Sequence, residues 1–446
     1  MASSSPIPLI AVEEGQFPPT LAAGEANWAK ANGFSGQRGR LLALPGADGG
    51  IGGYLFGLGE PAGRPRLILG SAAAALEPGR YSLAGAFGDP TLAALAFRLG
   101  AYRFDRYRRS RAAVELDDPE GADIAGVTRL ADAAYLARDL INTPANDLGP
   151  EALEQQIRAL TRRHGIEATV TVGDALLDQN FPMIHAVGRA AAEAPRLVEF
   201  SWGRADDPKV TLVGKGVTFD TGGLDIKTST GMLLMKKDMG GAANVLGLAH
   251  AIIDAGIKVR LRVLVPIVEN AISASAFRPG DILRARNGTT VEIGNTDAEG
   301  CLILADALAL ADEESPQLIV DMATLTGAAR TALGPDLPPL YATDDELARG
   351  LVAAGTASDD PLWQMPLWTP YEAMLSSRVA DVNNTGGAFA GSVTAALFLK
   401  RFVRQAGAWA HLDIYGWAPE ARPGRPFGGT DQGIRAVYGY LKQRYG

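Results

Sequence analysis

The amino-acid sequence predicts an α/β protein with a small N-terminal α/β domain and a larger C-terminal domain. We expect a central mixed, mostly parallel sheet flanked by helices in the larger domain. The chain has 446 residues, too many for one ordinary hydrophobic core, so two domains are expected. In its second part, short apolar runs alternate with helical segments, and this alternation is typical of a parallel sheet covered on both faces.

The N-terminal region alternates short apolar runs with glycine and proline. We expect strands at residues 41–44, 53–57 and 66–70, and helices at 90–99 and 127–141. These elements predict an α/β domain over residues 1–118. A connecting helical region is expected over residues 119–142, because Pro144 and its neighbouring asparagines interrupt the helical pattern there.

The C-terminal region, residues 143–446, shows the clearer alternation. We expect strands at 209–214, 259–267 and 318–322, and helices at 151–164, 240–255 and 302–311. In sheets of this kind, binding sites form beyond the carboxyl ends of the strands. Asp220 and Asp297 lie in glycine-rich loops beside predicted strands, so we expect a site that includes both.

Composition narrows the possible functions. The formal net charge of −8 and the isoelectric point near 5.2 argue against non-specific nucleic-acid binding as the main function. The single cysteine excludes an internal disulfide framework and fits a reducing compartment. No apolar run reaches the roughly 18 residues of a membrane span, and residues 1–6 lack the features of a secretory signal. We therefore expect a cytoplasmic protein without membrane spans.

A group of acidic residues carries the strongest chemical signal. Asp297 and Glu299 are two positions apart, so their side chains would point the same way in an extended segment. Two carboxylates on one side repel each other and need a cation, a shared proton or open water. Further charged residues are set among glycines and apolar residues upstream: Lys215, Asp220, Lys227 and Asp238.

Each of these residues also has an ordinary structural explanation. Asp220 alone is typical of a turn, Lys215 of an exposed loop and Asp238 of a surface charge, while Asp297 and Glu299 suit the start of a helix. Together they fit hard divalent ions better, because bridging carboxylates can hold two ions that activate water and polarise a carbonyl. One lysine could serve as a neutral amine ligand and another could stabilise an oxyanion. The residues alone predict a metal-assisted hydrolase.

Other catalytic signatures are absent from the sequence. Residues 214–216 do not make a phosphate-binding loop, and there is no Gly-x-Ser-x-Gly or His-Glu-x-x-His motif. We expect His411, in an apolar run, to be packed and hydrogen-bonded rather than a metal ligand. Cys301 alone is more typical of a small buried residue than of a nucleophile.

These motifs resemble those of the leucyl aminopeptidase (cytosol aminopeptidase) family of two-metal exopeptidases. The resemblance is strong over residues 140–446, and loose in the N-terminal part, which is short for the family. The motifs that carry it lie at residues 142–146, 214–227, 235–243, 278–281, 295–302, 321–327 and 384–387.

The resemblance implies a metalloprotease that releases Leu-like N-terminal residues from short peptides by means of a metal-bridging hydroxide. It implies two divalent ions per subunit, zinc or manganese with magnesium possible, and a cytoplasmic homohexamer. No membrane and no nucleic-acid partner are expected.

The resemblance also implies a role for each matching residue. Lys215, Asp220, Asp238 and Glu299 would hold the tighter ion, and Asp297 would join Asp220 and Glu299 around the more exchangeable one. Lys227 would contact the scissile carbonyl oxygen. The remaining residues would bind substrate: Met235 and Thr324 at the first side chain, and the backbone of Leu325 and Gly327 along the peptide.

Cys301 departs from the family pattern. Members of the family carry an arginine at this position, where it holds a bicarbonate ion that shuttles a proton. Cysteine is short and has no bidentate fork for an anion. We therefore expect bicarbonate to be absent or weakly held, and turnover to be reduced.

Two alternatives remain open on the sequence. One is a catalytically weak hexameric scaffold or DNA-binding protein of the same fold. The other is a metal-dependent amidase that acts on a non-peptide substrate.

Overall fold

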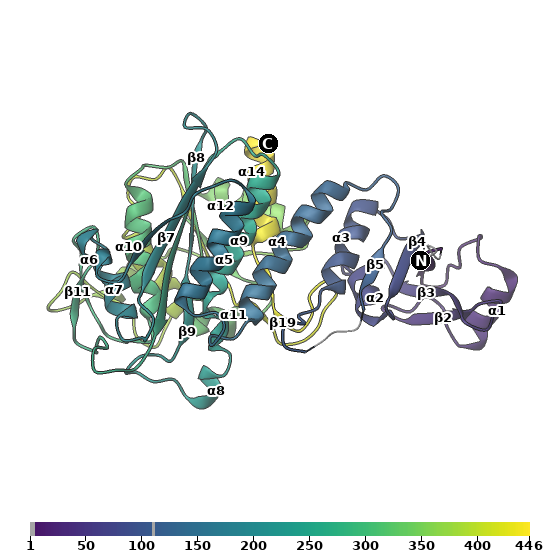
Figure 1. Cartoon of the computed structure of the whole chain (residues 1–446), viewed down its shortest axis with the longest axis horizontal. Coiled ribbons are helices and arrows are strands. Elements are labelled where there is room, and N and C mark those ends of the chain that lie inside the picture. Colours follow the sequence, from purple (N-terminus) through teal and green to yellow (C-terminus); the bar gives the residue numbers. More distant parts are fainter. Residues whose placement is uncertain (1–4, 109–111) are drawn as a thin grey trace. The chain divides into compact units, whose positions relative to one another are not determined.

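The computed structural model describes residues 5–108 and 112–446. It divides the chain into two compact units, the first formed by residues 1–135 and 418–428 and the second by residues 136–417 and 429–446. Each unit has its own sheet and helices, so the predicted α/β class is confirmed (Figure 1). The domain boundaries predicted from the sequence, at 118 and 142, stay a prediction. No helix within the described ranges is long and apolar enough to cross a membrane.

The first unit is built on a five-stranded sheet in the order β2-β3-β1-β4-β5. Its central strand pairs in parallel with β3 and β4, and β2 is antiparallel to β3. The strands are β1 (Ile7–Glu13), β2 (Leu41–Pro45), β3 (Ile51–Gly59), β4 (Gly79–Gly85) and β5 (Val114–Leu116). The helices are α1 (Ala23–Ala31), α2 (Leu69–Ala75) and α3 (Pro90–Ala101), and α3 begins where Asp89 accepts a hydrogen bond from the backbone N–H of Leu92.

The strand predicted at residues 66–70 is wrong. Residues 66–68 form a turn and Leu69 begins α2, and Leu67 is fully buried in the core of the first unit. The helix continues through four consecutive alanines, and alanine has the highest helix propensity. A short apolar run has the same periodicity in a buried strand and in the buried start of a helix, so the sequence did not separate the two.

The second unit contains the larger sheet, in the order β15-β14-β17-β13-β8-β10-β7-β6, with β9 paired to β10. Its centre is parallel, since β8 pairs in parallel with β10 and β13, and β13 with β17. Both flanks contain antiparallel pairs, so the predicted mixed, mostly parallel sheet is confirmed. The strands are β6 (Thr169–Val172), β7 (Arg196–Trp202), β8 (Lys209–Gly214), β9 (Gly216–Asp220), β10 (Arg260–Asn270), β13 (Leu318–Ala323), β14 (Pro339–Ala342), β15 (Trp363–Gln364) and β17 (Trp409–Asp413).

Smaller strands complete the chain. A three-stranded sheet joins β11 (Ile282–Arg284), β12 (Thr290–Glu292) and β16 (Val382–Asn383). Two further short strands are β18 (Trp417–Ala418) and β19 (Gly428–Gly429).

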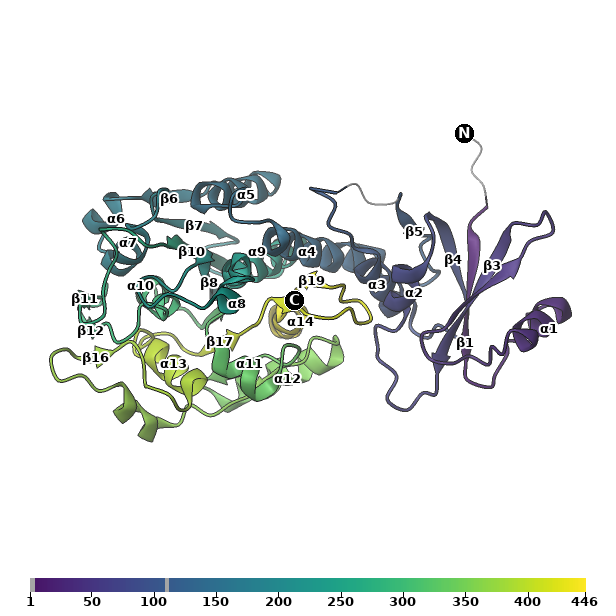
Figure 2. The ribbon, with the colours of Figure 1, turned by 90° about the horizontal axis from the view of Figure 1, so that it is seen from below.

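Helices cover the larger sheet. α7, α10 and α13 lie side by side and share one apolar cluster with the sheet (Figure 2). The small-residue helix α9 packs on β8 and β13, so closely that a Cβ at Gly241 would lie 2.1 Å from the carbonyl oxygen of Met322. The helices of the second unit are α5 (Pro150–Arg163), α6 (Ala175–Asp178), α7 (Pro182–Gly188), α8 (Ser229–Met232), α9 (Gly240–Asp254), α10 (Glu299–Asp312), α11 (Gly327–Leu333), α12 (Asp345–Ala357), α13 (Gly391–Lys400) and α14 (Ile434–Tyr445), with 3-10 helices η1 (Met235–Met239) and η2 (Thr369–Leu375). The boundary between the two units falls within α4 (Ile124–Asn142), after Tyr135.

The parallel strands deliver the candidate site residues to one edge of the sheet. Lys215 directly follows β8, Asp220 is the last residue of β9, and Thr324 directly follows β13. Asp413 is the last residue of β17. This is the edge at which open α/β sheets bind their ligands, and the sequence had predicted it for Asp220.

Candidate metal centre

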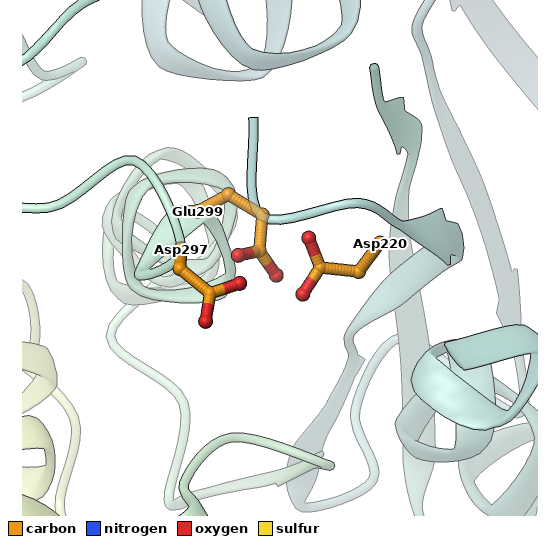
Figure 3. Close-up of side chains that lie close together, drawn as sticks. All are labelled: Asp220, Asp297 and Glu299. Carbon is orange, nitrogen blue, oxygen red and sulfur yellow. The ribbon is translucent and has the colours of Figure 1, made fainter. Parts of the chain in front are cut away.

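Three carboxylates converge beyond the carboxyl ends of the strands. Oxygen atoms of Asp220, Asp297 and Glu299 all lie within 4.8 Å of one another, and the side chains point toward a common centre (Figure 3). Asp220 and Glu299 are buried and Asp297 is half-buried. Three like charges held this close in a buried place require a cation or bound protons.

The local conformation of this motif differs from the sequence prediction. Asp297 lies in a turn and Glu299 is the first residue of α10, so the pair does not form an extended segment, and Glu299 occupies the helix start considered for it in the sequence. α10 begins at Glu299, three residues before the predicted start. An acidic residue is favourable there because the N-terminus of a helix carries the positive end of its dipole. The two carboxylates still meet, since the turn directs Asp297 back toward the helix start.

Lys215 links two of the acidic groups. Its Nζ lies 2.7 Å from Asp238 Oδ2 and 3.0 Å from Glu299 Oε1, and it donates a hydrogen bond to the carbonyl oxygen of Thr324. The Thr324 hydroxyl donates to Asp238 Oδ1 at 2.7 Å. Gly300 makes room for this arrangement, because a Cβ there would lie 2.5 Å from Lys215 Cε. The glycine after Glu299 is therefore a packing requirement of Lys215.

Lys227 approaches the acidic group from the loop after β9. Its Nζ lies 2.8 Å from Asp220 Oδ2 and contacts Asp297. Asp220 also makes the turn expected of an isolated aspartate, since its Oδ1 accepts hydrogen bonds from the Gly222 N–H and from Asn270 Nδ2. Asp220 therefore both stabilises a turn and belongs to the acidic cluster. Sequence analysis missed Asn270; its place at the end of β10, beside Asp220 on β9, was the available signal.

The electrostatics of the centre favour a bound cation. Four carboxylates, Asp220, Asp238, Asp297 and Glu299, face only two ammonium groups, Lys215 and Lys227. Burial and the neighbouring Asp220 raise the pKa of Asp297 to about 6 and that of Glu299 well above its ordinary value. Both carboxylate oxygens of Glu299 and one of Asp297 are buried without a hydrogen bond of good geometry.

The donor set also suits the chemistry of a divalent ion. Carboxylate oxygens are the preferred ligands of hard cations, and the unsatisfied oxygens of Asp297 and Glu299 face the shared centre. The residues present therefore fit divalent metal ions.

The two lysines are charged in this arrangement. Burial alone would lower the pKa of each side chain, but Asp238, Glu299 and Asp220 raise the pKa of Lys215, and Asp220 and Asp297 raise that of Lys227. A neutral amine at Lys215 therefore requires cations at the centre to oppose its proton. Its role as an amine ligand stays a prediction.

A cavity of about 380 Å³ opens onto the centre. Its wall brings together nine of the residues singled out from the sequence: Lys215, Asp220, Lys227, Met235, Asp238, Asp297, Thr324, Leu325 and Gly327. Sequence analysis missed several other residues of the wall, among them Lys237, Arg330, Asp413 and Tyr415. Arg330, Asp413 and Tyr415 lie outside the motifs found in the sequence, and Lys237, although inside the motif at 235–243, had no chemical role assigned to it.

Cys301 has a different setting. It is buried in the first turn of α10, belongs to the apolar cluster under the sheet, and is not part of the cavity wall. Burial, with a smaller effect of Glu299, raises the pKa of its thiol to about 12. A protonated, buried thiol is a poor nucleophile, in agreement with the prediction of a small buried residue.

His411 is also a structural residue. It lies fully buried on β17 with its Nδ1 2.5 Å from Asp321 Oδ1 on β13, and its ring stacks beside those of Tyr341 and Trp409. The prediction of a packed, hydrogen-bonded histidine is confirmed.

An α/β sheet that gathers carboxylates and lysines at its strand ends defines a metal-dependent hydrolase. The catalytic-domain model of the cytosol aminopeptidase family matches residues 135–438, and the model of the M17 aminopeptidase N-terminal domain matches residues 7–116. The chain belongs to the cytosol aminopeptidase family. Its N-terminal region, which resembled the family only loosely by its motifs, is thus matched as well.

Individual relatives agree with this assignment. A probable cytosol aminopeptidase of Syntrophotalea carbinolica is 42% identical over 364 residues, which cover 77% of this chain and 73% of the relative. The crystal structure of a cytosol aminopeptidase from Coxiella burnetii is 45% identical with a TM-score of 0.94, over 100% of this chain and 99% of that one. The bottromycin maturation enzyme BotP, in complex with Mn, is 35% identical with a TM-score of 0.91, over 99% of this chain and 100% of BotP. The chain is a metal-dependent aminopeptidase, a hydrolase that acts on peptides.

Proposed function

We propose that this aminopeptidase removes N-terminal residues, preferably Leu-like, from short peptides at a centre that holds two divalent ions. The observation that carries the proposal is the convergence of Asp220, Asp297 and Glu299 within 4.8 Å, with buried oxygens of Asp297 and Glu299 that lack a hydrogen bond of good geometry. The Mn complex of the similar BotP supports manganese; zinc is the other candidate, and magnesium is compatible with the ligand set.

The residues divide into two ligand groups. Asp220 and Glu299, the two buried carboxylates of the cluster, would help to hold both ions. Lys215 and Asp238, which contact each other, complete one group, and Asp297 completes the other. When bound, the two ions supply an activated water and polarise the scissile carbonyl.

The remaining residues orient the peptide. Lys227 keeps its proton, and its ammonium group stabilises negative charge on the scissile carbonyl oxygen. Met235 and Thr324, in the cavity wall, contact the first side chain, while the backbone at Leu325 and Gly327 positions the chain. A free terminal amine would bind one of the two ions, which would limit cleavage to the first residue.

Cys301 bears on the turnover of the proposed enzyme. Its short side chain is directed into the apolar cluster and lies outside the cavity wall, so it offers no cation for bicarbonate. We propose that bicarbonate is absent or weakly held and that turnover is lower than with arginine at this position. The proposal also includes a cytoplasmic homohexamer, and domains at residues 1–118 and 143–446 joined by the helical region 119–142.

The test is hydrolysis of Leu-p-nitroanilide by the full chain, before and after chelation of metal. We expect activity to be lost on chelation and restored by Mn²⁺ or Zn²⁺, with N-acetyl-Leu-p-nitroanilide not cleaved. Cleavage of the acetylated compound would instead favour an amidase that does not need a free amine.

Cys301 is also the observation that favours the second candidate, a catalytically weak hexameric scaffold or DNA-binding protein. No hydrolysis by the metal-loaded protein, together with a retarded DNA band in a gel-shift assay, would support that candidate.

A further inference from the structure

We propose that Lys237, Arg330 and Tyr415 form a cationic subsite in the wall of the cavity, and that this subsite binds a carboxylate of the peptide substrate. The carboxylate belongs either to the side chain of an acidic first residue or to the free C-terminus of a short peptide. The inference rests on the proposed aminopeptidase function and specifies a substrate class for it.

Lys237 is a buried cation without an acidic partner. Its side chain lines the cavity and the residue is only 4% exposed. The Nζ lies 4.7 Å from the centroid of the Tyr415 ring, and among residues 5–108 and 112–446 it forms no ion pair or side-chain hydrogen bond. The preceding Lys236 differs, since its Nζ donates to the carbonyl oxygen of Asn142 at 2.7 Å. A buried ammonium group without a carboxylate is costly, and the cation–π contact compensates only part of that cost.

Arg330 brings a second cation to the same ring. It lies in the last turn of α11, lines the cavity, and has its Cζ 4.7 Å from the centroid of Tyr415. Within the described part of the chain, its guanidinium also has no carboxylate partner. Lys237 Nζ and Arg330 Cζ each lie 4.7 Å from the centroid of the same ring, so the distance between these two atoms is at most twice that value. Two neighbouring cations repel each other and together attract an anion.

The nearest carboxylates of the wall are already engaged. Asp413 accepts hydrogen bonds from the N–H groups of Leu325 and Thr326, and from the hydroxyls of Thr326 and Ser392. Asp238 contacts Lys215 and accepts from the Thr324 hydroxyl. Neither acid pairs with Lys237 or Arg330, so the positive charge of the subsite faces the cavity.

The cavity wall therefore has two chemically different regions, the carboxylate cluster proposed to hold the metal ions and the Lys237–Arg330 pair. The proposed metal centre suits the terminal amine of a peptide, and the Lys237–Arg330 pair suits a carboxylate of the same molecule. Arginine is well adapted to this, since its planar fork matches a carboxylate bidentately. A substrate with an amine at one end and a carboxylate nearby complements both regions.

Two pairs of substrates separate the sources of the carboxylate. Glu-p-nitroanilide against Gln-p-nitroanilide tests the first side chain, and Leu-Gly against Leu-glycinamide tests the C-terminus. We expect the charged member of at least one pair to have a kcat/KM about 10- to 100-fold higher, the effect of one charge-assisted hydrogen bond. Lys237→Met and Arg330→Gln should each bring that ratio close to one. Lys442→Gln, at an exposed lysine of α14 outside the cavity wall, should leave it unchanged.

The outcomes separate this proposal from the proposed function. Equal kcat/KM values within both pairs, or a preference that survives both substitutions, overturn the subsite while Leu-p-nitroanilide hydrolysis upholds the aminopeptidase. If Lys237→Met does not fold, Arg330→Gln, at an exposed position, decides alone.

Two further readouts complete the test. If the metal-loaded protein cleaves nothing, the proposed function fails, and calorimetry with Glu-amide against Gln-amide and with the dipeptide pair still decides the subsite. Tighter binding of a charged member, lost in Arg330→Gln, supports it, and equal binding overturns it. A bicarbonate-dependent rise in Leu-p-nitroanilide turnover that disappears in Lys237→Met also overturns it, in favour of a free anion.

Discussion

At the scale of single residues, Gly300 shows how a small side chain maintains the proposed metal centre. A Cβ at this position would lie 2.5 Å from Lys215 Cε, which is too close for either atom to remain in place. We expect Gly300→Ala to displace the Lys215 ammonium and to lower kcat/KM on Leu-p-nitroanilide by about 10²-fold, the effect of a misplacement near 1 Å.

Gly439→Ala is the matched control for this substitution. Gly439 is also helical, and its Cβ would meet Ala354 Cβ at 3.5 Å, an ordinary contact. The control should keep wild-type activity. Unchanged activity in Gly300→Ala would show that the position of Lys215 does not matter to the reaction.

Cys301 gives the second prediction at this scale. Cys301→Arg, assayed with added bicarbonate, should raise kcat on Leu-p-nitroanilide, because general-base assistance contributes roughly 10²–10⁴-fold. The wild-type protein should respond little to bicarbonate. The proposal fails if the substituted protein folds, binds its metals and gains no activity with bicarbonate.

At the scale of elements, a buried aspartate–histidine hydrogen bond joins two central strands. Asp321 on β13 pairs in register with His411 on β17, and its second oxygen accepts a hydrogen bond from Trp409 Nε1 at 2.7 Å. Asp321→Ala leaves both partners buried without an acceptor. We expect a loss of about 3–5 kcal/mol in the free energy of unfolding, measured with urea. A loss below 1 kcal/mol would mean that the pair contributes little.

The same pair gives stability a pH dependence. Burial lowers the pKa of His411, but Asp321 outweighs burial and raises it above the ordinary value of 6.5. The folded state therefore binds the proton more tightly than the unfolded chain, so this contribution is complete below pH 6.5 and is lost as pH rises through the higher folded pKa. Urea midpoints should fall across that range in the wild type. They should fall less in His411→Gln, and identical pH profiles would contradict the assignment.

Predictability from sequence also differs among the elements. Periodicity identified the strand at 209–214 and the helix at 240–255 within a residue or two, because both repeat a clear apolar pattern. It failed at 66–70, where the same apolar pattern fits a strand and a helix start. Local patterns do not encode which tertiary neighbour a short segment will meet.

At the scale of the whole molecule, local sequence patterns also reveal only part of the site. The residues grouped at the centre had shared motifs in the sequence, so their convergence could be predicted. Lys237, Arg330 and Tyr415 come from η1, α11 and the loop after β17, and only the folded chain brings them to one ring. Whether a charged side chain such as Lys237 or Arg330 has an ion-pair partner can be judged only when its neighbours in the folded chain are known.

The excess negative charge of the centre links metal binding to the stability of the whole chain. An ion that binds only the folded state stabilises it, by about 2.7 kcal/mol at a concentration 100 times its Kd. We expect Mn²⁺ or Zn²⁺ to raise the Tm of the metal-free protein. Glu299→Gln removes a buried charge beside Asp220, so it should raise the Tm without metal and remove most of the metal-induced increase. Differential scanning calorimetry with and without metal measures both effects, and Glu346→Gln, at an exposed acid of α12, is the control. A full metal-induced increase in Glu299→Gln would remove this residue from the ligand set, whereas a lower metal-free Tm would show that the attraction of Lys215 outweighs the repulsion among the acids.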